Sequence, residues 1–157
     1  MPRHPYKKKT IEVDPVYESY EVAKFINYIM YNGKKDVASQ IVYDTFEEIK
    51  KTGEEPMKVF MKAISNVAPD LEVRPRRLGG ASYLVPAEVR KDRKIYLALH
   101  WIIEAARARS NKEFKEFTGK LVSELLEASK NQGQAVNKRL QAEKVAEANK
   151  AFSHLKW

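Results

Sequence analysis

The hydrophobic pattern of the chain changes period twice, and these changes separate two helical parts from a short extended one. In residues 18–69 apolar side chains recur every three or four positions, which predicts three amphipathic helices. Their expected limits are Glu18 to Asn32-Gly33, an N-cap at Asp36 to Thr52-Gly53, and Pro56 to Pro69. The side chains expected to face a core are Val22, Phe25, Ile26, Ile29, Met30, Ala38, Ile41, Val42, Thr45, Ile49, Met57, Phe60, Met61, Ile64 and Val67.

The period becomes two after Pro69, which predicts strands. Apolar Tyr83, Val85, Ala87 and Val89 alternate with the residues between them. Gly79-Gly80 predicts a tight hairpin turn, because such turns need positive φ angles. Pro75 and Pro86 have no N–H to donate, so neither arm suits a central strand. We therefore expect an exposed two-stranded ribbon over residues 72–90.

Helical spacing returns at Asp92, an acceptable N-cap, and predicts three more helices. They run from Asp92 to Ser110-Asn111, from about Phe114 to Asn131-Gln132-Gly133, and from Gln134 to about Lys150. The expected inward residues are Ile95, Leu99, Ile102, Ala106, Phe114, Phe117, Leu121, Leu125, Val136, Leu140, Val145 and Ala146. The predicted fold is mainly α: a six-helix bundle with one extended β-hairpin inserted between helices 3 and 4. The length of 157 residues predicts a single domain, with residues 1–15 as a flexible basic tail.

The charge pattern indicates a polyanion as the partner. The formal net charge is +8 and the isoelectric point is about 9.5. The excess is uneven, since residues 41–73 hold seven acids and four bases whereas residues 74–94 hold seven bases and two acids. A local concentration of this kind predicts a basic face. The cations lie on the ribbon and tail and not on an amphipathic helix, which argues against an anionic membrane.

Several classes of function find little support in the sequence. There is no cysteine, which removes disulfide frameworks, thiolate catalysis and cysteine-based zinc sites and fits a cytoplasmic protein. No apolar window is long enough for a membrane span. His100 and Glu104 lie four apart on a predicted helix, but two residues do not make a metal site. No catalytic or phosphate-loop motif is present, so we expect no enzyme activity, no cofactor and no small-molecule substrate.

The cations form three groups that suit phosphate groups. In the ribbon Arg74 and Arg76 lie two apart and so share one face, while Arg77 points to the other. Near the start of the fourth helix, where the helix dipole favours anions, a second set follows. Lysines in the tail and after the first helix complete the groups. The full set is Arg74, Arg76, Arg77, Arg90, Lys91, Arg93, Lys94, Lys7, Lys8, Lys9, Lys34 and Lys35.

The kind of polyanion is less constrained by these features. Tyr83 suits either stacking on a base or packing across the ribbon. A helical body with a projecting β-ribbon also describes architectural DNA-binding proteins, so that alternative stays open beside RNA.

Four stretches carry a resemblance to a known family: KFINYIMYNGKK (24–35), EVRPRRLGGASYLVPAEVR (72–90), HWIIEAARARS (100–110) and AEANKAFSHLKW (146–157). Their order and length resemble the seventh protein of the small ribosomal subunit in its bacterial form, over nearly the whole chain. The resemblance implies six helices with a hairpin after the third. It also implies a structural role: a primary binder of 16S rRNA that nucleates assembly of the 3′ major (head) domain, close to exit-site tRNA and the mRNA path.

The resemblance further implies partners and contact residues. The expected partners are the 3′ major domain of 16S rRNA, exit-site tRNA, the eleventh small-subunit protein and other head proteins, without a membrane. It adds Arg3 to the rRNA-binding set above and places the hairpin tip near tRNA. A basic residue often stands in this family where this chain has His100. The tip residues are Leu78, Gly79, Gly80, Ala81, Ser82 and Tyr83.

Overall fold

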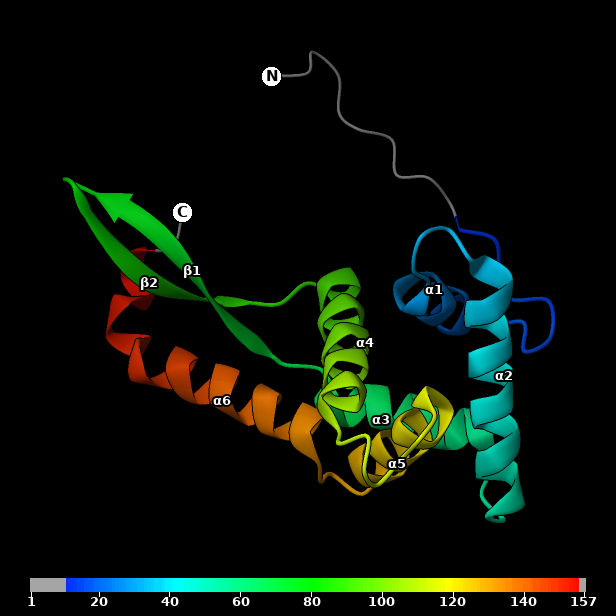
Figure 1. Ribbon diagram of the computed structural model, residues 1–157. Helices are drawn as coiled ribbons and strands as arrows, with labels where there is room; N and C mark the ends of the chain where they lie inside the picture. Colours follow the sequence, from blue (N-terminus) through cyan, green and yellow to red (C-terminus); the bar gives the residue numbers. More distant parts are fainter. Residues whose placement is uncertain (1–10, 156–157) are drawn as a thin grey trace.

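The computed structural model describes residues 11–155, which form six α-helices, one antiparallel two-stranded sheet and a short 3₁₀-helix (Figure 1). The order is α1 (Tyr20–Ile29), α2 (Lys35–Lys51), α3 (Pro56–Val67), β1 (Leu71–Leu78), β2 (Ala81–Glu88), α4 (Lys91–Ala108), α5 (Phe117–Ser129), α6 (Gln134–Ala148) and η1 (Lys150–Leu155). The predicted helical fold with a hairpin between the third and fourth helices is confirmed. None of the helices in this part of the chain is long and apolar enough to cross a membrane.

The hydrophobic core lies where α5 packs against α2, α3 and α4. Leu121 and Leu125 of α5 are fully buried. Phe60 of α3 joins the neighbouring helices, because its ring lies 5.1 Å from that of Phe25 in α1 and 5.5 Å from that of Phe46 in α2. Full burial of such a side chain stabilises the fold by about 1.5–3 kcal/mol. The first five helices therefore form a body with its own core.

Three residues that we expected to face the core are exposed instead. Met61 is 44% exposed because the buried stripe of α3 runs through its neighbours Val59, Phe60 and Ala63. Leu140 and Val145 are 50% and 42% exposed. Both lie on α6, which leaves the body and runs beside the hairpin (Figure 1). The first turn of α6 buries Ala135 and Val136 in the core of the body, and Ala146 is the buried residue farther along the helix, beside the hairpin.

Several predicted boundaries were also wrong. The N-caps of α2 and α4 are Lys34 and Arg90. Asp36 and Asp92 lie instead within the first turn of each helix, where a negative charge interacts favourably with the helix dipole. Phe114 lies in the loop before α5 and not in the helix. The sixth helix ends at Ala148, and Lys150 begins the 3₁₀-helix. Residue propensity and hydrophobic spacing predict the presence of a helix more reliably than its first and last residues.

The hairpin is the element that projects from the body, and it has its own support. The register runs from Leu71 opposite Glu88 to Leu78 opposite Ala81. Gly79 and Gly80 have φ angles of 55° and 92°, as a two-residue hairpin turn requires. The two strands pack against α6, and β2 also packs against η1 (Figure 1). The expected ribbon therefore does not stand alone in solvent, and Val85 of β2 is buried.

A buried ion pair fixes the point from which α6 departs. Arg109, the C-cap of α4, donates to Glu124 at 2.6 Å and to Glu127 at 2.5 Å, both on α5. The other oxygen of Glu124 accepts the N–H of Ala135 in the first turn of α6 at 3.0 Å. Lys120 donates to the Arg109 carbonyl at 2.7 Å. These bonds hold the end of α4, the face of α5 and the start of α6 together.

Candidate nucleic-acid interface

The predicted cations at the base of the hairpin converge on the start of α4. Only Val89 and Arg90 separate β2 from α4, and Val89 is buried while its N–H donates to Asp70 at 3.0 Å. Arg90 caps the helix with an extended backbone, and its carbonyl accepts the N–H groups of Arg93 and Lys94 at 2.9 Å. This tight passage brings cations of the strands and of the helix to one place. We call Arg74, Arg76, Arg90, Lys91, Arg93 and Lys94 the hairpin-base cluster.

Carboxylates of the same chain hold part of this cluster. Glu72 accepts hydrogen bonds from Arg74 at 2.6 and 2.9 Å and from Arg93 at 3.3 Å. Burial alone would raise the pKa of Glu72, but the two guanidinium groups outweigh it and keep that pKa below its ordinary value. Lys94 forms an ion pair with Asp70. Glu72 thus fixes the directions of two arginines from different elements.

These ion pairs leave the surface positive and accessible. Residues 70–94 hold seven Lys and Arg against four Asp and Glu. The paired Arg74 and Arg93 side chains are still 45% and 48% exposed. Arg90 and Lys91 are exposed and have no carboxylate partner within residues 11–155. An arginine has five donors, so one that binds Glu72 retains groups for a phosphate.

The strand register places the hairpin arginines as expected. Arg74 pairs with Val85 and Arg76 with Tyr83, so the two arginines share a face, whereas Arg77 opposite Ser82 lies on the other. The tip residues 78–82 are exposed. Tyr83 is half-buried and its ring lies 5.3 Å from that of Phe152 in η1. Tyr83 therefore packs against the C-terminal segment and not across the ribbon.

The second basic group lies at the turn between α1 and α2. Asn32 and Gly33 take left-handed conformations, with φ angles of 52° and 74°. Lys34 and Lys35 follow at the start of α2 and are exposed. Lysine cannot accept a hydrogen bond, and no side chain caps this helix, so its first N–H groups and both ammonium groups favour an anion. The predicted tail contacts, Arg3 and Lys7 to Lys9, lie outside the described residues and stay predictions.

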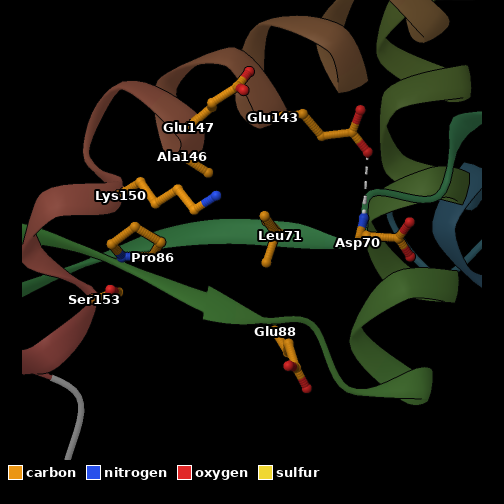
Figure 2. A pocket seen from close by; sticks show the side chains of 9 residues that line it. All are labelled: Asp70, Leu71, Pro86, Glu88, Glu143, Ala146, Glu147, Lys150 and Ser153. Carbon is orange, nitrogen blue, oxygen red and sulfur yellow. Dashed lines mark hydrogen bonds between the residues drawn. The ribbon is translucent and has the colours of Figure 1, made fainter.

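A groove lined mainly by acidic residues, opposite in charge to the basic groups above, lies between the hairpin and α6 (Figure 2). Its volume is about 530 Å³, and its floor includes Leu71, Pro86 and Ala146. Four acids line it, namely Asp70, Glu88, Glu143 and Glu147, together with one cation, Lys150. Figure 2 shows the N–H of Asp70 donating to Glu143, at 3.4 Å, across one end. The acids that line this groove therefore disfavour a phosphate there.

The structure also gathers aromatic residues that the sequence reasoning missed. Tyr96 and His100 of α4 stack with ring centroids 4.7 Å apart, and Tyr28 of α1 lies edge-on to both at 5.5 Å. The four-residue spacing of Tyr96 and His100 was the available signal. Nothing local in the sequence pairs them with Tyr28. Glu104 pairs with Lys138 at 2.5 Å, and no group of three or more His, Cys, Asp or Glu side chains that could hold a metal ion was found among the residues described.

Comparison with known proteins identifies the family. Residues 1–150 match the family described as ribosomal protein S7p/S5e. The chain belongs to this ribosomal protein family. It is 49% identical to the small ribosomal subunit protein uS7 of Caldanaerobacter subterraneus subsp. tengcongensis and 50% identical to that of Thermodesulfovibrio yellowstonii. Each comparison spans the full length of both chains.

Membership of the S7p/S5e family confirms the resemblance drawn from the sequence. It makes the chain a ribosomal protein with a structural, non-enzymatic role in translation. The alternative of an architectural DNA-binding protein finds no support in this match. The positions of individual rRNA contacts within the family fold stay predictions.

Proposed function

We propose that this protein is a structural constituent of the small ribosomal subunit that binds the 3′ major domain of 16S rRNA and nucleates assembly of the head. The observation that carries the proposal is the hairpin-base cluster, on a chain whose full length matches the family. Cations from β1, the β2–α4 junction and α4 meet there. Because Glu72 and the short passage from β2 to α4 hold these elements together, the cations point toward a bound phosphate in set directions. An rRNA junction bound to them would have the directions of its arms fixed.

The lysines between α1 and α2 provide a second point of attachment. They lie on the opposite side of α4 from the hairpin (Figure 1). Two separate basic groups on one rigid body suit an RNA that spans both, as a multi-helix junction does. The basic tail is proposed to add contacts through Arg3, Lys7, Lys8 and Lys9.

The hairpin is proposed to serve a different group of partners. Its tip, residues 78–83, would reach toward exit-site tRNA and the mRNA path. The acidic groove beside α6 is complementary in charge to basic ribosomal proteins, which supports a contact of the hairpin region with the eleventh small-subunit protein and other head proteins.

Salt dependence tests the electrostatic part of the proposal. Among the predicted rRNA contacts in residues 11–155, five exposed cations have no carboxylate partner there: Arg77, Arg90, Lys91, Lys34 and Lys35. Counterion release by five such contacts would lower the affinity for a 3′ major domain fragment about 100- to 1000-fold between about 50 and 200 mM salt. A three-way rRNA junction should also compete better than random duplex DNA. A flat salt response, or equal competition by the DNA, would contradict the proposal.

Charge reversal tests the location of the site. Arg90→Glu with Lys91→Glu changes two exposed side chains that have no described carboxylate partner, so the fold is expected to persist. The matched control is Lys112→Glu with Lys115→Glu, which makes the same charge change in the loop beyond the far end of α4. That end is about 27 Å away along a helix of 18 residues. The first variant should lose far more rRNA affinity, and equal losses would indicate nonspecific attraction.

A further inference from the structure

The aromatic residues between α1 and α4 form a site that the proposed phosphate contacts do not use. We call Tyr28, Tyr96 and His100 the ring cluster. Tyr96 and His100 are nearly parallel, with 23° between their planes. Tyr28 is almost perpendicular to both, at 87° and 81°. All three side chains are half-buried, so each ring retains an accessible part.

The ring cluster is continuous with the hairpin-base cluster. The guanidinium carbon of Arg93 lies 5.0 Å from the centre of the Tyr96 ring. Arg93, Tyr96 and His100 therefore form one stack along a single stripe of α4. At the α1 side, Lys24 lies one turn before Tyr28, and its ammonium group is 4.5 Å from the ring centre of Tyr20. Cations thus flank the rings at both ends.

The polar atoms of the ring cluster lack partners within the protein. Nδ1 of His100 is buried and makes no hydrogen bond in residues 11–155. No hydrogen bond of the Tyr28 or Tyr96 hydroxyl group is found within residues 11–155. Burial raises the pKa of Tyr28, so its hydroxyl stays a neutral donor. A buried atom such as Nδ1 of His100 normally finds a partner, and leucine would fill this helix contact without that cost. The two tyrosine hydroxyls are not among the buried atoms without a partner, so they are open to a ligand.

We propose that the ring cluster is a contact site for an unpaired base of RNA. Aromatic side chains interleaved with cations are the usual means by which proteins hold single-stranded bases. A base would pack on the accessible parts of the rings, its edge would accept or donate hydrogen bonds with the hydroxyls and the imidazole, and Arg93 would hold a neighbouring phosphate. The inference rests on the proposed rRNA binding and adds a contact that depends on the base and not on charge.

Two variants and their salt dependence test the inference. Tyr28→Leu with Tyr96→Leu removes two rings and keeps apolar volume, while Tyr28→Phe with Tyr96→Phe keeps the rings. The leucine pair should weaken binding of the full chain to a 3′ major domain fragment about 5- to 100-fold, because stacking is lost. Its slope of log affinity against log salt should match wild type, since no phosphate contact disappears. The phenylalanine pair should lose less.

The comparison variant is Arg93→Gln, which should lower the salt slope by about one contact. If the leucine pair binds like wild type, the inference is wrong, and an RNA contact of the rings is excluded in favour of packing or a protein partner. If the salt slope of the leucine pair falls as much as that of Arg93→Gln, the rings act only by positioning Arg93. That result would also overturn a base contact. If wild type itself fails to prefer the rRNA junction, the proposed function fails first.

Tyrosine nitration of the wild-type chain tests the inference even if the leucine pair fails to fold, as a loss of its helical circular dichroism signal would show. Tetranitromethane should modify Tyr28 and Tyr96 in the free protein, because both are half-buried and not sealed. Mass spectrometry should find both protected in the complex with the rRNA fragment. Equal nitration with and without RNA would overturn the proposal without any variant.

Discussion

Replacing Arg109 by methionine is expected to destabilise the fold and to loosen the attachment of α6. The Arg109 side chain is only 12% exposed and Glu124 is not exposed at all. Methionine keeps much of the apolar stem but removes the positive charge. The Glu124 carboxylate would then be buried with the Ala135 N–H as its remaining donor. An unpaired buried charge is among the most destabilising changes in a protein interior.

The expected loss follows from the burial of this pair. Removing one partner of a buried ion pair costs about 3–5 kcal/mol. For a chain of 157 residues this corresponds to a fall in Tm of about 6–20 °C. Thermal unfolding followed by circular dichroism measures it. Because α6 supports the hairpin, the variant should also bind rRNA with lower affinity at temperatures where its helical signal is still intact.

Two further variants separate the buried charge from other causes. Lys138→Met makes the same charge change in the pair with Glu104, whose side chains are 40% and 51% exposed, and should cost about 1 kcal/mol or less. Adding Glu124→Gln to Arg109→Met removes the stranded charge and keeps an acceptor for Ala135, so stability should partly return. The reasoning is refuted if Arg109→Met and Lys138→Met lower Tm equally.

Three other predictions concern acid, a glycine and the hairpin. The hydrogen bond from Arg109 lowers the pKa of Glu127, and Arg74 and Arg93 outweigh burial to lower that of Glu72. Both carboxyls thus add stability that is present above their ordinary pKa of 4.5 and lost as the pH falls through the lower folded values. Tm should therefore drop more between about pH 6 and pH 3 in wild type than in Glu72→Gln with Glu127→Gln, and parallel curves would contradict this. Gly133→Ala should lower Tm more than Gly53→Ala: both have positive φ, but a Cβ at residue 133 would lie 3.0 Å from Glu124 whereas residue 53 is open. Equal losses would mean that backbone strain alone acts. Deleting residues 76–84 and closing the gap should leave the helical circular dichroism signal in place, because that segment contributes little to the core and its ring contact is Tyr83 with Phe152. A large loss of helix would show that the hairpin supports the body.

The local signals in the sequence were sufficient for the elements and for the basic residues. The hydrophobic periodicity and the turn residues predicted the helices and the hairpin. Both signals depend on side chains a few positions apart and on glycines such as Gly79 and Gly80. The alternation of β1 also put Arg74 and Arg76 on one face. Local spacing says little about ends, which is why Asp36 and Asp92 were wrongly predicted as N-caps.

The course of α6 shows where periodicity stops being informative. Leu140 and Val145 recur at helical spacing, yet only the first turn of α6 packs in the core of the body, and the rest of the helix runs beside the hairpin. Which apolar residues are buried depends on the partner surface, and a narrow ribbon covers less of a helix than a bundle does.

The sequence by itself determined that this protein is a basic, mainly helical ribosomal protein with an arginine-bearing hairpin, because composition, period and family motifs are properties of neighbouring residues. The tertiary structure alone decided that Glu72 holds Arg74 beside Arg93, that Arg109 closes on Glu124, and that Tyr28 meets Tyr96 and His100. Apart from the Glu72–Arg74 pair within β1, each of these contacts joins different elements. Their directions and burial are fixed only when the elements pack on a common core, and no local pattern records that packing.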